Sequence, residues 1–152
     1  MKDPFFLERP RLGDLLMRKG LITQEQLTEA LVESRSSGEL LGRILIRRGH
    51  IFGDELARSL AEQLNLPYVN LHSLGVDSSV ARMIPAGEGR RAAVIPVGTI
   101  GGRIRVALAD PSDETALALV ARHISAPYEL AVGELSDIDR AWRAIEKRIG
   151  GA

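Results

Sequence analysis

Residues 11–34 read RLGDLLMRKGLITQEQLTEALVES, and after a spacer of five residues the stretch 40–63 reads LLGRILIRRGHIFGDELARSLAEQ. The two stretches align without a gap at an offset of 29 residues. The matching positions are Leu12-Gly13 with Leu41-Gly42, Leu16 with Leu45, Gly20 with Gly49, Ile22 with Ile51, Leu27 with Leu56, and Leu31 with Leu60. So many coincidences in one register indicate a duplicated unit.

The first copy has the pattern of a short helix, a glycine stop and a longer helix. The leucines within residues 12–16 fall on one helix face. Gly20 follows two cations, as at the left-handed cap that ends a helix. Thr23 and Gln26 have the spacing of a capping box, which predicts the start of the longer helix.

The second copy repeats this pattern with a less regular start to its longer helix. Gly49 again follows two arginines, but Phe52 stands at the position of the capping threonine. Gly53 and Asp54 are therefore expected to begin the helix. The two copies together predict four short helices, with Ser36-Ser37-Gly38 as the hinge between them.

The second half of the chain changes from helical spacing to short apolar runs. Three strands are predicted, at residues 94–97, 104–108 and 128–132. Gly101-Gly102 is a hairpin signal between the first two, Asp110-Pro111-Ser112 is expected to open a helix, and a last helix carries Ile138 and Trp142. The expected fold class is α+β, with a duplicated helical module at residues 1–65 and a small three-stranded α+β module at residues 66–152.

The composition is that of a soluble globular protein. Hydrophobic residues make up 45% of the chain, and twenty basic residues balance twenty acidic ones, so no global charge favours nucleic acid as a partner. The chain has no cysteine, which excludes disulfides and thiolate chemistry. No apolar run approaches the roughly 18 residues that span a bilayer, so we expect no membrane insertion and a cytoplasmic location.

No catalytic or metal-binding constellation is visible in the sequence. The phosphate loop of ATPases is missing, and the three histidines His50, His72 and His123 are isolated from one another. The one local carboxylate cluster comprises Asp110, Asp113 and Glu114, residues that are common at a helix start because the free N–H groups there attract anions. We therefore expect no enzymatic activity, no metal and no cofactor.

Arg11 is the one residue that departs from these structural preferences. It lies at the expected first turn of a helix, where a cation is unfavourable by a few tenths of a kcal/mol. A guanidinium beside exposed N–H donors is suited to an anion, and arginine also binds guanine through its O6 and N7 atoms. An exposed solvated arginine is the alternative explanation.

The repeated pattern R-L-G-x-x-L-x(3)-G-x(6)-L-x(3)-L-x(2)-Q resembles the signature of the MshEN domain, found in the N-terminal regions of type II secretion and type IV pilus assembly ATPases. Phrases of the second half are also similar to those regions, including residues 66–71, Ile95-Pro96-Val97 and Ala109-Asp110-Pro111. The resemblance implies a regulatory domain that binds cyclic di-GMP, and an ATPase domain that follows it in longer relatives.

The resemblance also implies a set of ligand-binding residues in each copy. Arg11 is expected to contact a guanine and the phosphate region, and Gln63 to hydrogen-bond a base or a phosphate. The first apolar wall is formed by Leu12, Gly13, Leu27 and Leu31, and the second by Leu41, Gly42, Leu56 and Leu60. Ser34 stands where the family has glutamine, so one amide contact is expected to be absent.

Two alternatives remain open on the sequence alone. In the first, cyclic di-GMP binds and is coupled to secretion or pilus assembly proteins at the inner face of the cytoplasmic membrane. In the second, the leucines and glycines only pack and end four helices, and the chain is a protein-docking adaptor without a nucleotide.

Overall fold

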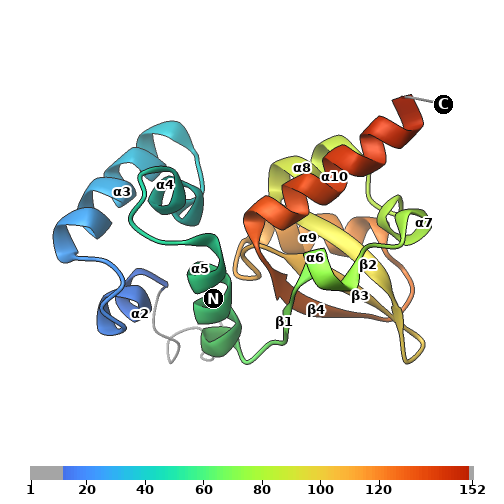
Figure 1. The fold of residues 1–152 in the computed structure, drawn as a ribbon, viewed down its shortest axis with the longest axis horizontal. Helices are drawn as coiled ribbons and strands as arrows, with labels where there is room; N and C mark the ends of the chain where they lie inside the picture. The colour runs from blue at the N-terminus through green and yellow to red at the C-terminus, as the bar shows by residue number, and fades with distance from the viewer. Residues whose placement is uncertain (1–11, 151–152) are drawn as a thin grey trace. The chain divides into compact units, whose positions relative to one another are not determined.

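The computed structural model describes residues 12–150, with side chains through residue 147. The chain divides into two compact units, Met1–Asn65 and Leu66–Ala152, which we call the helical unit and the sheet unit. Figure 1 shows helices in the first unit and a sheet covered by helices in the second.

The helical unit alternates short and longer helices, as the repeat predicts. Its described helices are α2 (Leu12–Arg18), α3 (Gln24–Ser37), α4 (Leu41–Arg47) and α5 (Gly53–Leu64). Gly20 and Gly49 have φ angles of 74° and 76°, the left-handed conformation that follows a helix and suits glycine. The predicted hinge is wrong in extent, because α3 continues through Ser37 and ends at the left-handed cap Gly38.

The starts of the two longer helices differ as their sequences predict. At α3 the Gln26 backbone N–H donates to Thr23 Oγ1 at 3.1 Å, and the Thr23 N–H donates to Gln26 Oε1 at 2.9 Å. At α5 the Phe52 N–H donates to Glu55 Oε1 at 3.1 Å, but phenylalanine offers no side-chain acceptor in return. The capping box is therefore complete in the first copy and half complete in the second.

The sheet unit contains a mixed sheet whose strand order is β1-β4-β3-β2. The strands are β1 (Tyr68–Val69), β2 (Val94–Ile100), β3 (Arg103–Leu108) and β4 (Tyr128–Gly133). β2 and β3 form an antiparallel hairpin, while β4 is parallel to both β3 and β1. The α+β class is confirmed, but the predicted three strands are wrong because the described residues form four. The missed strand, β1, has two residues and is too short to show any alternation in the sequence.

Five helices are described in the sheet unit, and the sequence predicted two of them. They are α6 (Leu71–Leu74), α7 (Ser78–Ala81), α8 (Ala86–Ala92), α9 (Glu114–His123) and α10 (Leu135–Gly150). The predicted start of α9 at Asp110 is wrong. Asp110 Oδ1 accepts the Ser112 N–H at 3.0 Å in a turn, and Asp113 caps the helix by accepting the Thr115 N–H at 3.0 Å.

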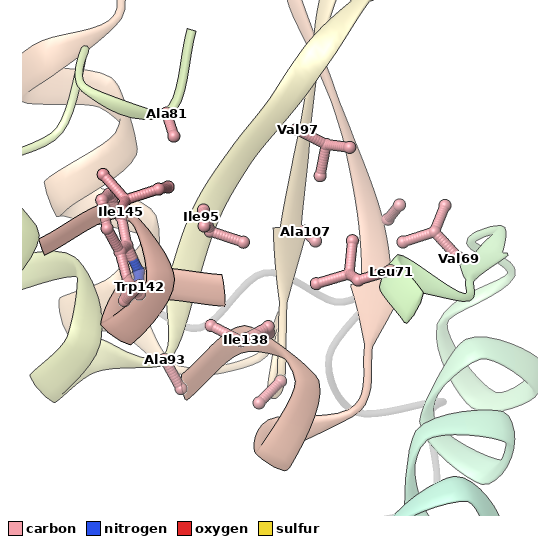
Figure 2. Close-up of a cluster of buried hydrophobic side chains, with 12 residues drawn as sticks. Val69, Leu71, Ala81, Ala93, Ile95, Val97, Ala107, Ile138, Trp142 and Ile145 are labelled. Carbon is pink, nitrogen blue, oxygen red and sulfur yellow. The ribbon is translucent and has the colours of Figure 1, made fainter. Parts of the chain in front are cut away.

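The sheet carries an apolar cluster on each face, because successive strand residues point to opposite sides. Leu119 and Val120 of α9 pack in one cluster, and Ile138, Trp142 and Ile145 of α10 pack in the other. Figure 2 shows these three α10 side chains beside the strands that carry Ile95 and Ala107. Each face of the sheet is therefore covered by one of the two longer helices of this unit.

Trp142 joins α10 to two other elements of the sheet unit. Its side chain is fully buried, and its indole Nε1 donates to the backbone oxygen of Val94 at 2.8 Å. Gly89 of α8 lies directly against the indole ring, since a Cβ on this glycine would lie 2.6 Å from Trp142 Cζ2. The indole therefore fixes both the spacing of α8 and α10 and the start of β2.

We expect Gly89→Ala to lower the free energy of unfolding by about 1–3 kcal/mol, the usual cost of overpacking a filled core. The added methyl would also lie 2.9 Å from the Val94 backbone oxygen, which cannot turn away as a flexible side chain can. Chemical denaturation followed by circular dichroism measures the change. Gly87→Ala is the matched control in the same helix, where the nearest contact to a new Cβ is Arg91 Nη1 at 3.9 Å. Equal stability of the two variants would contradict the expectation.

Candidate functional site

The structure brings together one glycine and one leucine of each apolar wall that the sequence predicts. A Cβ on Gly13 would lie 2.6 Å from Leu27 Cδ1, and a Cβ on Gly42 would lie 2.7 Å from Leu56 Cδ2. The same close approach of short helix to longer helix thus occurs once in each copy, at positions 29 residues apart. A Cβ at either glycine would force the facing leucine side chain to move.

The predicted ligand-binding residues differ in how much surface they leave for a ligand. Leu27, Leu56 and Leu60 are 5%, 6% and 1% exposed, so they belong to the core of the helical unit. The half-buried members are Leu12, Leu31, Ser34, Leu41, Gly42 and Gln63. The surface available to a ligand among the described residues therefore comes from this second group. Arg11 lies outside the described residues.

Ser34, the departure from the family pattern, has a structural partner of its own. Its hydroxyl donates to the backbone oxygen of Glu39 at 2.7 Å, across the connection between α3 and α4. The serine thus ties the end of the first copy to the last residue of the spacer, just before the second copy. A glutamine at this position would replace the hydroxyl that makes this bond.

The helices pair across the two copies. α2 packs against α5, and α4 packs against α3, so each short helix lies on the longer helix of the other copy. An ion pair at the end of each short helix also joins it to the longer helix of the other copy. Lys19, after α2, is paired with Glu62 of α5, and Arg48, after α4, is paired with Glu33 of α3, where Nη2 lies 2.6 Å from Oε1.

These contacts are equivalent under exchange of the copies. Lys19 and Arg48 are 29 residues apart, and so are Glu33 and Glu62. The backbone turns after the short helices match as well, since the Leu21 N–H donates to the Leu16 oxygen and the His50 N–H to the Leu45 oxygen, both at 2.9 Å. The helical unit is therefore built from two equivalent halves, each composed of elements from both copies.

The ion pair between Arg48 and Glu33 belongs to a larger charge cluster. Glu33 binds Arg47 as well as Arg48, and Arg47 also lies 3.0 Å from Glu39. The hydrogen bond from Arg48 is the main cause that lowers the pKa of Glu33 below its ordinary value. Glu33 is therefore ionised at neutral pH and holds both arginines near the end of α4.

This crossed pairing is not among the features predicted from the sequence, although the sequence contains a signal for it. The residue before each left-handed glycine is a cation, Lys19 or Arg48, and the matching positions in the longer helices are acidic, Glu33 and Glu62. Opposite charges at two repeat-related positions indicate a contact, but they do not tell whether it forms within a copy or between copies.

The sheet unit offers a separate concave surface. A groove of about 270 Å³ lies along α6 and α10, lined by apolar side chains such as Leu71 and Ile145 and by polar ones such as His72 and Arg140. In the described part of the chain, no three His, Asp or Glu side chains gather as a metal site. None of the described helices has both the length and the apolarity to cross a membrane.

The family model of the MshEN domain matches residues 64–152, more than half of the chain. Two bacterial proteins are similar to the chain in sequence. The chain is 39% identical over 109 residues to the type IV pilus assembly ATPase PilB of Thermus thermophilus, covering 71% of this chain and 12% of that protein. It is 30% identical over 135 residues to the type II secretion system protein E of Xanthomonas campestris pv. campestris, covering 85% of this chain and 24% of that protein. The chain thus spans a small part of the length of these relatives.

A relative with a different name carries a similar region. The bacteriophage adsorption protein B of Escherichia coli strain K12 is 31% identical over 113 residues, covering 74% of this chain and 15% of that protein. The similar region is therefore a module that occurs in proteins of more than one kind.

Two solved structures share the fold over nearly the whole chain. The structure of MshE with cdg has a TM-score of 0.69 and 30% identity, covering 90% of this chain and 99% of that one. The structure of the N-terminal domain of XpsE has a TM-score of 0.75 and 27% identity, covering 88% of this chain and 92% of that one. Because the sheet unit alone is little more than half of the chain, these matches include much of the helical unit.

Proposed function

Because the chain belongs to the MshEN domain family, we propose that it is a non-catalytic regulatory module that binds cyclic di-GMP through the helical unit. It couples that binding to a type II secretion or type IV pilus machine, the kind of assembly named for its relatives. The ligand class is supported by the likeness to MshE with cdg, which extends over 90% of the chain.

The observation that carries the proposal is the equivalence of the two halves of the helical unit. Cyclic di-GMP consists of two identical nucleotides, so two equivalent surfaces suit one molecule of it. Each copy offers a close glycine–leucine contact, Gly13 with Leu27 and Gly42 with Leu56, beside a half-buried leucine at the start of the short helix. Such apolar surfaces suit the flat faces of guanine bases.

Calorimetric titration of the chain with cyclic di-GMP is the experiment that tests the proposal. GTP and cyclic di-AMP serve as controls, because GTP lacks the second nucleotide and cyclic di-AMP lacks the O6 and N2 groups of guanine. We expect saturable binding of cyclic di-GMP and much weaker binding of both controls. No detectable heat or shift in melting temperature with cyclic di-GMP would contradict the proposal.

We expect Gln63→Ser to weaken binding of cyclic di-GMP about two- to tenfold. The reason is the loss of one hydrogen bond to the ligand, which contributes about 0.5–1.5 kcal/mol, since serine cannot reach as far as glutamine. Gln24→Ser is the matched control, because Gln24 is exposed at the first turn of α3 and lies outside the family pattern. Equal affinities of wild type and Gln63→Ser would remove Gln63 from the site.

The docking adaptor is the second candidate function, and the groove along α6 and α10 is the observation that favours it. A docking domain without a nucleotide would bind its partner equally well with and without cyclic di-GMP. Failure of the titration, together with an intact fold by circular dichroism, would make it the leading function.

A further inference from the structure

We propose that the crossed ion pairs Lys19–Glu62 and Arg48–Glu33 are positioning contacts of the cyclic di-GMP site. They set the orientation of α2 and α4, the short helices that present the ligand-binding leucines and glycines. This inference rests on the proposed function. None of the four residues falls on a specified position of the repeated signature, so the resemblance gives them no role.

Each short helix is fixed at its two ends by different longer helices. At its start, α2 touches α3 of its own copy through Gly13 and Leu27, and at its end it is joined to α5 of the other copy through Lys19 and Glu62. The equivalent contacts of α4 are Gly42 with Leu56 and Arg48 with Glu33. The ion pair therefore adds a contact at the end of each short helix to the packing of α2 against α5 and of α4 against α3.

The length of the short helices makes this orientation sensitive to the ion pair. A helix of seven residues is about 10 Å long, so a small displacement at one end changes its direction appreciably. If the end of α2 leaves α5, the helix turns about the contact between Gly13 and Leu27. Leu12 then moves relative to the ligand.

The glutamates of these pairs also lie next to predicted ligand residues in the longer helices. Glu62 precedes Gln63, and Glu33 precedes Ser34. Neighbouring residues of a helix point about 100° apart, so a glutamate that faces the cation of the other copy does not share the direction of the residue after it. The pair therefore lies beside Gln63 on α5 without sharing its direction.

The two pairs are unequal, which decides where to test them. Glu33 is held by Arg47 as well as Arg48, so the loss of one cation leaves another in place. Among residues 12–147, Glu62 is ion-paired with Lys19. The Lys19–Glu62 pair is therefore the simpler contact to reverse.

The test compares Glu62→Lys, Lys19→Glu and the double variant that carries both changes, each titrated with cyclic di-GMP. We expect each single variant to bind about five- to tenfold more weakly than wild type, because attraction is replaced by repulsion. The double variant restores an ion pair in the opposite sense, and we expect its affinity to return to within about twofold of wild type. Melting temperatures should differ by no more than a few degrees, because exposed ion pairs contribute little to stability.

Glu129→Lys is the matched control in the sheet unit, where Glu129 and Arg105 form a part-exposed ion pair with Nη2 and Oε1 2.8 Å apart. Its affinity for cyclic di-GMP should equal that of wild type. Where Glu62→Lys unfolds the chain, Glu62→Gln removes the pair without repulsion, and an affinity loss of about two- to threefold is expected.

The possible results separate this inference from the function on which it rests. No binding by wild type overturns both. Binding by wild type with unchanged affinity in the single variants overturns the positioning role alone. Weak binding in the single variants that the double variant does not restore overturns it as well, because the residues then act separately and not as a pair.

Discussion

Replacing Trp142 by alanine is expected to lower the free energy of unfolding by about 3–5 kcal/mol, the usual range for truncating a buried tryptophan. The side chain is fully buried between α10, α8 and β2, and the substitution removes its hydrogen bond to the Val94 oxygen together with the packing surface for Gly89. Urea denaturation followed by circular dichroism measures the loss. Fluorescence serves only for wild type, because Trp142 is the one tryptophan of the sequence.

Trp142→Phe is the control that separates packing from hydrogen bonding. It keeps an aromatic ring in the cluster but leaves the Val94 oxygen without the indole donor, which costs about 1–3 kcal/mol for a buried acceptor. We expect its stability to lie between those of wild type and Trp142→Ala. A loss below about 1 kcal/mol in the alanine variant would show that the cavity closes and that Trp142 does not fix α8 to α10.

Arg11→Ala is expected to weaken the binding of cyclic di-GMP about tenfold to a hundredfold, since a hydrogen bond to a charged group contributes about 1.5–3 kcal/mol. The expectation rests on the repeated pattern and its family resemblance, as Arg11 lies outside the described residues. The melting temperature should barely change, because a cation at the start of a helix is not favourable to it. Calorimetry and a thermal melt of the same sample measure the two quantities.

Arg18→Ala provides the matched control, because Arg18 is exposed in the last turn of α2. It removes a charge of the same sign only seven residues away in the sequence, so the loss of a general electrostatic attraction to the anionic ligand would weaken binding equally in both variants. We expect Arg18→Ala to bind almost as wild type does. If Arg11→Ala melts several degrees lower and binds cyclic di-GMP normally, Arg11 stabilises the fold and does not bind the ligand.

Local signals in the sequence predicted the helical unit well. The left-handed glycines Gly20 and Gly49, the capping box at Thr23 and the start of α5 at Gly53 each depend on a few neighbouring residues, and each is confirmed. Features decided by distant partners were missed. β1 exists because Tyr68 pairs with Val132, and the left-handed Ala93, with φ 56°, lies where its backbone oxygen accepts the Ala109 N–H. Neither pairing can be read from the short stretch that makes it.

The candidate site could be predicted as a set of residues but not as a surface. The repeat identified Leu27, Leu56 and Leu60, yet these three are buried, and leucine periodicity does not distinguish a core position from one that faces a ligand. Ser34 was recognised as a departure from the family pattern, whereas its bond to the Glu39 oxygen depends on how the chain turns between α3 and α4. The missing information in both cases is the direction in which neighbouring helices approach.

The two halves of the helical unit are equivalent in space, but the crossed pairing of the helices means that they are not synthesised in equivalent order. Arg48 follows its partner Glu33 by 15 residues, so α3 has already been synthesised when α4 is made. Lys19 precedes Glu62 by 43 residues, so α2 has no partner across the copies until α5 has been made. Closing the longer loop is also slower, because bringing its ends together costs more conformational entropy. The α3–α4 half is therefore expected to form first, with α2, the earliest of the four helices to be synthesised, among the last to find its place.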